Sequence, residues 1–239
     1  MFDFIRKPTI WKAWDEGLET SIGKTTHSFG LKSIQDLAVY GELKEETGKA
    51  IAEIGAGYSR VLLALAKANR CVAVEKFEGK GGGPKTKKAD AGVEHVSAYL
   101  GVNDPLLPTA AFDVVFSISV VEHVQTSELA AFHADQLRIL KPGGVFMHAI
   151  DMYLQDTPEP EAQYVRRFEA YRAWVALTRG VEPVGPVYWG TCRFTNDMAT
   201  NPDNTLYRWG KSAPNLINLR QQAQSVSLLL AGRKLNGSG

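Results

Sequence analysis

The chain has 239 residues with a hydrophobic content of 44%, which is enough for a substantial core. Its 27 basic and 26 acidic residues leave a formal net charge of +1, without the basic excess of a nucleic-acid-binding protein. The sequence contains no run of about 18 apolar residues, so we expect no transmembrane helix. Its first residues lack the long apolar stretch of a signal peptide, so we do not expect export. Two cysteines without metal-ligand spacing favour a reducing compartment. We expect a cytoplasmic protein with no membrane, nucleic-acid or metal partner.

The first 48 residues predict a helical cap, with short helices around Trp11–Glu19 and Ser33–Glu46. A buried strand at 50–55 follows, then a glycine turn and a helix at 59–69 with Ser59 as its N-cap. A second buried strand at 71–75 ends in an acid, and a glycine- and lysine-rich loop occupies 78–90.

The remaining pattern alternates apolar strands with helices. It predicts strands at 93–101, 112–120, 145–150 and 225–234, helices at 126–140 and 160–179, and a turn at the KPGG stretch 141–144. Such alternation indicates a parallel sheet covered by helices on both faces. We therefore expect one domain, with an N-terminal cap (1–48), a core (49–151), and substrate-side additions with the final strands (152–239).

The glycine turn "EIGAGYSR" raises the question of its ligand. A strand, a tight turn and a helix N-terminus point backbone N–H groups at one place, which suits an anion or a polar group. A dinucleotide fingerprint that starts at Gly55 needs glycine or alanine at its sixth position, which is Arg60, and no P-loop lysine follows. Instead, Glu53 precedes the turn and Glu75 ends the next strand. One carboxylate suits a ligand ammonium group and the other suits ribose hydroxyls, a combination that S-adenosylmethionine (SAM) presents.

Four ordered motifs then carry a family resemblance. The stretches "AEIGAGYSRVLLALA", "CVAVE", "FDVVFSISVVEHV" and "LRILKPGGVFMHAID" resemble those of class I SAM-dependent methyltransferases, across roughly residues 49–151. The resemblance implies a Rossmann-like, doubly wound α/β fold with a seven-stranded, mostly parallel sheet whose last strand is antiparallel. It implies that Glu53, Gly55 and Gly57 line the methionine part of SAM and that Glu75 binds the ribose.

The residues expected around the cofactor are grouped after the first, second, third and fourth core strands. They are Glu53, Gly55, Ala56, Gly57, Glu75, Lys76, Asn103, Asp104, Ser119 and Val120. The chain departs from the family pattern in several respects, one of which is the glycine- and lysine-rich loop at 78–90, where the family often has a helix. Ser59 stands where the third glycine is usual, and the usual acid after the third strand is missing, which leaves Asn103 or Asp104 for the adenine amino group.

Methyl transfer to a hydroxyl needs an oriented acceptor and a base near the carboxyl ends of the fourth and fifth core strands. Glu122 and His123 follow the fourth strand, while His148 and Asp151 end the fifth. We take His123, His148 and Asp151 as catalytic candidates. The competing interpretations are a packing or cofactor-side role for His123, a core position for His148, and a turn or N-cap carboxylate for Asp151.

The sequence thus predicts a SAM-dependent methyltransferase that acts on a hydroxyl of a small-molecule acceptor, such as a sugar, a glycan precursor or a secondary metabolite. No [DN]PP[YF] motif or Pro-Cys pair supports the methylation of adenine, glutamine or cytosine. The alternatives are a NAD(P)-dependent oxidoreductase, which Arg60 disfavours, a catalytically silent SAM-binding protein, and a macromolecular methyltransferase.

Overall fold

A computed structural model describes six parts of the chain. These are residues 1–23, 30–79, 83–86, 92–155, 160–200 and 224–237. Part of the predicted basic loop at 78–90 lies outside these ranges. None of the helices within the described ranges is long and apolar enough to cross a membrane.

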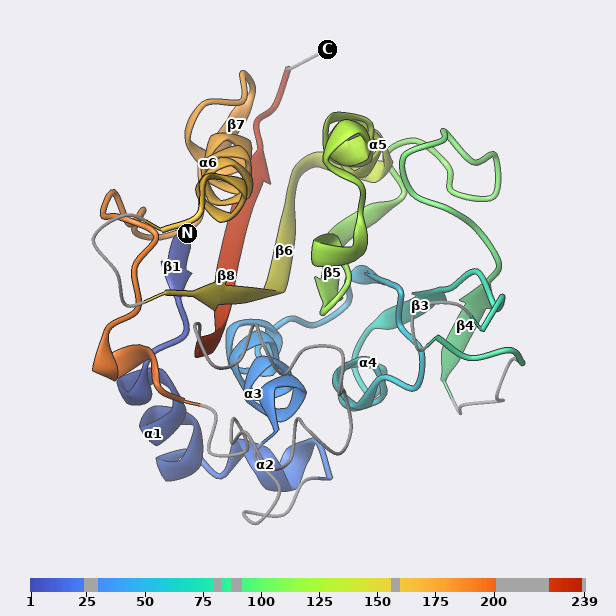
Figure 1. Cartoon of the computed structure of the whole chain (residues 1–239). Coiled ribbons are helices and arrows are strands. Elements are labelled where there is room, and N and C mark those ends of the chain that lie inside the picture. The colour runs from blue at the N-terminus through green and yellow to red at the C-terminus, as the bar shows by residue number, and fades with distance from the viewer. Residues whose placement is uncertain (24–29, 80–82, 87–91, 156–159, 201–223, 238–239) are drawn as a thin grey trace.

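A single mixed sheet forms the centre of the molecule (Figure 1). Its strands are β1 (Phe2–Phe4), β2 (Ala50–Ile54), β3 (Arg70–Val74), β4 (Val93–Val96), β5 (Phe112–Ile118), β6 (Leu140–Leu154), β7 (Val181–Pro183) and β8 (Gln224–Lys234). Their order is β1-β8-β6-β5-β2-β3-β4, and β7 also pairs with β8. Strands β2 to β6 are parallel, and β8 is antiparallel to β6. The predicted fold is confirmed, with eight strands because the short β1 and β7 both flank β8.

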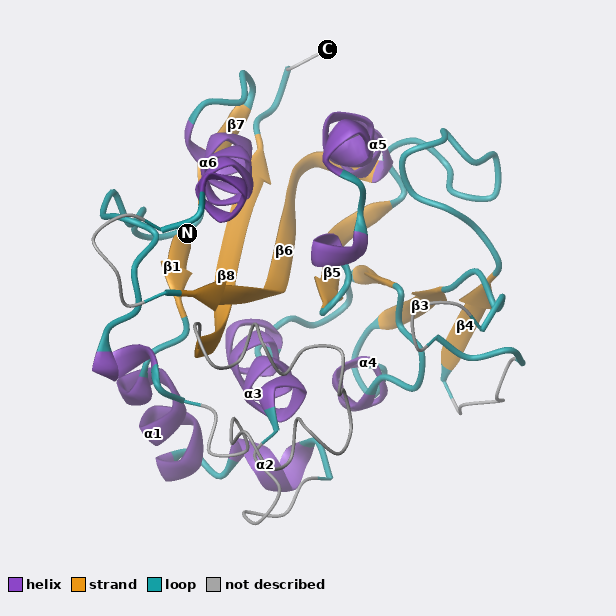
Figure 2. Ribbon diagram, viewed as in Figure 1, coloured by secondary structure: helices purple, strands orange, loops and turns teal. Residues whose placement is uncertain are grey.

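Helices cover both faces of this sheet, as Figure 2 shows. They are α1 (Lys7–Asp15), α2 (Leu18–Ser21), α3 (Leu31–Leu43), α4 (Arg60–Leu65), α5 (Leu129–Ile139) and α6 (Ala162–Ala176). The first four lie on one face, where α3 and α4 close an apolar layer. Helices α5 and α6 lie on the other face over a second apolar layer. The expected three-layer arrangement follows from the apolar residues on both faces of β2, β5 and β6.

The KPGG stretch differs from its prediction as a turn. It belongs to β6, which starts at Leu140 opposite Phe112, shifts register before Val114, and accommodates Gly143 at a φ of 78°. Beyond the predicted end at residue 150, β6 continues because β8 pairs with it along ten consecutive residues, from Val145 to Leu154. A long-range partner therefore sets the length of this strand, which local pattern does not reveal.

The N-terminal segment also differs from its prediction. The first helix begins at Lys7 instead of Trp11, because Pro8 stands in its first turn, where a missing N–H costs nothing. Ahead of it, β1 pairs antiparallel with β8, and the rings of Phe2 and Phe4 lie 5.0 and 5.6 Å from the ring of Phe168 on α6. Three residues are too short a strand to be identified from periodicity alone.

The polarity of the sheet creates a crevice between β2 and β5. The chain leaves β2 toward β3 and β4 on one side, and returns to β5 and β6 on the other side. The connections that follow β2 and β5 therefore diverge at the carboxyl ends of these strands, which is where ligands bind in open parallel sheets. As predicted, Ser59 caps α4 there, since its Oγ accepts a hydrogen bond of 3.0 Å from the N–H of Leu62.

The aromatic contact of β1 yields a stability prediction. Phe2→Ala removes a fully buried ring and should lower the free energy of unfolding by about 3–5 kcal/mol. Trp11→Ala is the matched control on the neighbouring helix, because Trp11 is 54% exposed and its loss should cost less than about 0.5 kcal/mol. Urea unfolding of both variants measures the difference. Equal losses would show that β1 does not anchor the sheet edge.

Candidate active site

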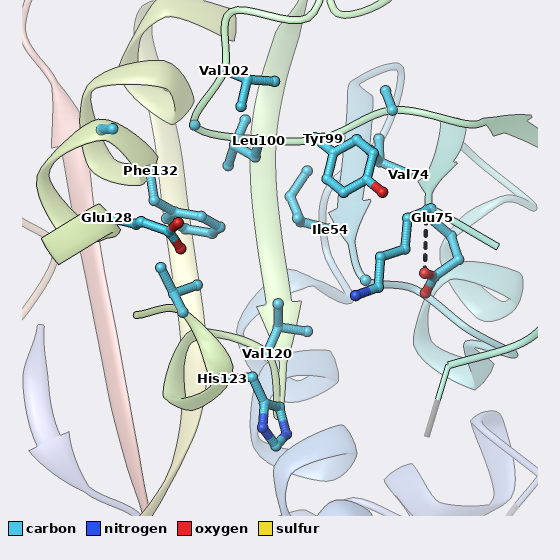
Figure 3. Close-up of a pocket in the computed structure, with 16 residues that line it drawn as sticks. Ile54, Val74, Glu75, Tyr99, Leu100, Val102, Val120, His123, Glu128 and Phe132 are labelled. Carbon is cyan, nitrogen blue, oxygen red and sulfur yellow. Dashed lines mark hydrogen bonds between the residues drawn. The ribbon is translucent and has the colours of Figure 1, made fainter. Parts of the chain in front are cut away.

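One cavity of about 430 Å³ opens at the carboxyl ends of the strands on either side of the β2–β5 crevice (Figure 3). Its walls come from the ends of β2 and β3, the segment after β4, the turn after β5, and the start of α5. The lining residues are Ile54, Gly55, Val74, Glu75, Lys76, Ala98, Tyr99, Leu100, Gly101, Val102, Val120, His123, Val124, Glu128, Ala131 and Phe132. A mostly apolar wall with a few polar groups is typical of a small-molecule site.

The glycine turn brings backbone against the opposite wall. Gly55 has a φ of 65°, and its N–H donates a 2.8 Å hydrogen bond to the carbonyl of Val74. A Cβ at this position would lie 2.6 Å from Cγ2 of Val120, so both the conformation and the space require glycine. The turn continues through the buried Ala56 to Gly57, which has a φ of 53°.

Glu75 stands at one end of the cavity, directly after β3. Its side chain is nearly buried, and its N–H donates a 3.1 Å hydrogen bond to the carbonyl of Val96. The N–H of Lys76 donates to Oε1 of Glu75 at 2.8 Å, the dashed line in Figure 3. These contacts hold the carboxylate at the cavity wall, directly after the second core strand.

His123 stands at another end of the cavity, beyond Val120 in Figure 3. It belongs to a single 3-10 turn over Val121–His123, and its side chain is exposed. The preceding carboxyl group, that of Glu122, has both oxygens buried. Burial, followed by the neighbouring charge of Asp151, raises the pKa of Glu122 to about 8.

Asp151 lies inside β6, near its carboxyl end, and is held there by a small polar network. The Gln35 Nε2 donates to Asp151 Oδ1 at 2.6 Å, and the Ser119 Oγ lies 2.6 Å from Gln35 Oε1 and 3.3 Å from the same Asp151 oxygen. Ser119 adopts a φ of 54°, which is uncommon for a residue with a side chain and aims its hydroxyl at this network. Asp151 is half-buried and is connected to the helix layer of α3 rather than to that of α5.

Glu53 lies under the glycine turn and faces the layer of α3 and α4. Its carboxyl group is buried, and burial raises its pKa to about 8, against the lowering effects of the Ser59 hydroxyl, Lys32 and Arg60. Asp36 adds a raising effect and forms an ion pair with Arg60. The Glu53 Oε2 has no hydrogen-bond partner within the described residues. An uncompensated acid next to a ligand turn fits the ammonium group that the sequence predicts there.

His148 has a different role from the predicted catalytic one. Its ring is completely buried on the α5 side of β6, with Nδ1 2.8 Å from the Ser117 Oγ and Nε2 2.6 Å from the Gln136 Oε1. Burial lowers its pKa to about 3, so the ring is neutral at physiological pH. Since side chains alternate along a strand, His148 and Asp151 face opposite layers. His148 is a hydrogen-bonded core residue, and it does not line the cavity.

Asn103 and Asp104 do not line the cavity either. The Asn103 N–H donates to Asp135, and the Asp104 carboxylate accepts from the N–H groups of Tyr99 and Leu106 at 3.2 and 3.0 Å. The reason is that β4 ends at Val96, whereas the pattern predicts a strand to residue 101. The chain therefore reaches the cavity earlier than expected.

Sequence reasoning missed three large side chains of the cavity, Tyr99, Glu128 and Phe132. A shorter third core strand would have pointed to Tyr99, because residues directly after a parallel strand face the crevice. Glu128 and Phe132 lie one helical turn apart at the start of α5, a spacing that puts them on one face. Of the predicted cofactor residues, Gly55, Glu75, Lys76 and Val120 line the cavity, while Glu53, Ala56, Gly57 and Ser119 are not among its lining residues.

The fold and the crevice define an open α/β protein with a ligand site at its switch point, and comparisons with known proteins give its class. Residues 52–148 match the family described as "Methyltransferase domain". No curated protein matches the chain. The predicted resemblance to class I SAM-dependent methyltransferases is confirmed, and so is the predicted enzyme class.

Solved structures share the fold at low identity. They include 1,6-didemethyltoxoflavin-N1-methyltransferase of Burkholderia thailandensis, with 15% identity, a TM-score of 0.51, and coverage of 95% of this chain and 86% of that chain. Geranyl diphosphate C-methyltransferase of Streptomyces coelicolor A3(2) gives 14% identity, a TM-score of 0.53, and coverage of 86% and 81%. The (4+2)-cyclase SpnF gives 15% identity, a TM-score of 0.55, and coverage of 95% of both chains. At such identities the likeness concerns the fold alone.

The buried Glu53 carboxyl yields a prediction about pH and stability. The pKa of Glu53 rises from 4.5 in the unfolded chain to about 8 in the folded protein. Its protonation therefore contributes fully to the free energy of unfolding below the unfolded pKa, and this contribution is lost as the pH rises through the folded pKa. Between about pH 5 and pH 8, the free energy of unfolding should fall with a slope of up to about 1.4 kcal/mol per pH unit for this group. Glu53→Gln should flatten this slope in urea unfolding.

Glu94→Gln serves as the matched control, because Glu94 is an exposed carboxylate on β4. This variant should keep the wild-type pH dependence. Glu122, whose pKa is raised to about 8 as well, should preserve part of the slope in Glu53→Gln. An unchanged slope in Glu53→Gln would contradict a protonated Glu53.

Proposed function

We propose that this chain transfers the methyl group of SAM to a hydroxyl oxygen of a small-molecule acceptor. The observation that carries the proposal is one continuous cavity whose lining includes Glu75, directly after β3, and His123, on the turn after β5. The acidic residue Asp151 lies in the neighbouring strand β6, and its charge acts on Glu122 of the turn that carries His123.

The residues present fit SAM in three respects. Glu75 accepts the ribose hydroxyls, as an acid at the end of the second core strand does in dinucleotide sites. Apolar side chains at Leu100 and Phe132 offer a slot for a planar ring. The unpartnered oxygen of Glu53 offers an acceptor for the ammonium group. Two of the similar structures, the Burkholderia and Streptomyces methyltransferases, hold S-adenosylhomocysteine, which supports the assignment.

Bound SAM supplies a methyl group that its sulfonium already activates. The protein then has to align an acceptor oxygen with the carbon–sulfur bond and remove the hydroxyl proton as the carbon–oxygen bond forms. In this proposal His123 accepts that proton, because its ring is exposed at the cavity. Asp151, fixed by Gln35 and Ser119, orients the acceptor or serves as the alternative base.

Titration calorimetry with SAM, S-adenosylhomocysteine and NADH tests the cofactor assignment. We expect the first two ligands to bind and NADH not to bind. Glu75→Ala should weaken SAM by about 10- to 100-fold, since hydrogen bonds to a charged group are lost. Glu94→Ala, on the adjacent strand and outside the cavity, should leave the affinity unchanged.

Two results would count against the assignment. Binding of NADH alone would favour the oxidoreductase alternative. SAM binding without transfer to any pool of hydroxyl compounds would favour a protein that uses the fold for other chemistry. The resemblance to a (4+2)-cyclase gives that second alternative a concrete precedent in fold.

The choice of base gives a separate prediction, to be measured once an acceptor is found. His123→Gln should lower kcat by about 10²- to 10⁴-fold and remove the acidic limb of the pH–rate profile, while SAM affinity stays near that of the wild type. His148→Gln should lower the melting temperature and leave the shape of the pH–rate profile unchanged, since His148 is a core residue. If Asp151→Asn abolishes the acidic limb and His123→Gln keeps it, Asp151 is the base.

A further inference from the structure

A single guanidinium group from α6 reaches the turn that follows β5. The terminal Nη2 of Arg167 lies 3.2 Å from the carbonyl oxygens of Val121 and Glu122 and 3.1 Å from that of Val124. Its Nη1 lies 3.5 Å from the Thr126 Oγ1. Arg167 and this turn are more than forty positions apart in the chain, so the contact is purely tertiary.

The guanidinium is itself held in place. Its Nε and Nη2 donate to the Tyr171 hydroxyl at 3.0 and 2.7 Å, and its carbon lies 5.6 Å from the centre of that ring. Tyr171 is almost completely buried, and its ring packs edge-on against Trp174 at 5.8 Å. The planar fork of arginine is therefore oriented by the core of the α6 layer before it meets the turn.

The turn depends on this contact for its position. Within residues 120–124 the only internal backbone bonds described are those from His123 N–H to Val120 and from Val124 N–H to Val121. Three carbonyl groups of the turn converge on Arg167 instead. The same turn carries Val120, His123 and Val124, all of which line the cavity. The side chain of Glu122, with its buried carboxyl, projects from the same turn.

We infer that Arg167 is a positioning residue: it fixes the 120–124 turn so that His123 is presented to the acceptor and Val120 and Val124 close the cofactor wall. Its kinetic consequence rests on the proposed function, whereas its effect on the turn does not. A displacement of about 1 Å at a reacting group can cost about 10²-fold in rate, so loss of the fork acts on catalysis without touching a ligand.

The chain offers a matched control in the next residue. Arg166 is exposed on the same helix and makes no hydrogen bond or ion pair with the residues that the structure describes. Arg167→Ala and Arg166→Ala remove the same charge from adjacent positions. Arg167→Lys keeps the charge, but its ammonium group lacks the planar fork that reaches three carbonyls and a tyrosine hydroxyl. This variant therefore separates the effect of the fork's geometry from the effect of its charge.

Hydrogen exchange of the whole chain is the first readout, because it needs no acceptor. We expect Arg167→Ala to accelerate exchange of the amides in residues 119–128 by about tenfold or more, with the strands β2 and β3 unchanged. Arg166→Ala should exchange like the wild type. Acceleration throughout the chain would mean that Arg167 only stabilises the fold, and no local acceleration would overturn the inference.

Kinetics and chemical rescue are the second readout. Arg167→Ala should lower kcat by about 10- to 100-fold and weaken SAM by a smaller factor, and Arg167→Lys should fall between it and the wild type. Guanidinium chloride, added far below its unfolding concentration, should restore part of the rate to Arg167→Ala and none to His123→Gln. If kcat of Arg167→Ala equals that of the wild type, so that there is no loss for guanidinium to restore, the positioning role is overturned. A wild type without methyl transfer would refute the proposed function and leave the exchange result to decide on Arg167.

Discussion

The close approach of Gly55 to Val120 is the constraint on which the site depends. These residues follow the ends of β2 and β5 at the switch point of the sheet, and no Cβ at position 55 fits between them. The contact joins the turn after β2 to the turn after β5. The glycine turn in the cavity wall therefore packs directly against the turn that carries His123. A side chain at position 55 would push the two turns apart and open the crevice to water, which the apolar lining residues are arranged to exclude.

The same edge of the sheet gathers acids whose side chains are buried or partly buried. Glu53 and Glu122 are buried and hold their protons more firmly than a free carboxyl does, and Asp151 lies beside Glu122. A fold selected for stability alone would avoid such groups, because an unpaired buried charge costs several kcal/mol. Their concentration around one ligand crevice is typical of a functional site and not of a core.

The sequence predicted what local chemistry decides. The alternation of apolar strands and helices, the cap at Ser59 and the acid at Glu75 all lie where the pattern indicates, since each depends on nearby residues. What failed depends on distant partners. β1 forms because β8 and Phe168 receive it, and β6 extends because β8 pairs along it. Asn103 and Asp104 do not line the cavity because β4 ends at Val96, and the apolar pattern does not reveal where this strand ends.

His148 and Asp151 show most clearly why the position of a residue in a strand does not by itself predict whether it belongs to the core or to the site. Both residues lie near the carboxyl end of β6, three positions apart, and both have side chains suited to proton transfer. Because side chains alternate along a strand, His148 and Asp151 point to opposite faces of the sheet. His148 lies in the α5 layer, where its ring nitrogens form hydrogen bonds with Ser117 and Gln136, and Asp151 accepts a hydrogen bond from Gln35 on α3. Only the assignment of each face to a helix layer separates them. A further contact comes from α6, since the Arg167 guanidinium reaches the carbonyl of Glu122, whose carboxyl group is affected by the charge of Asp151. One edge of the sheet thus carries the candidate residues of the site, and helices on both faces contact them.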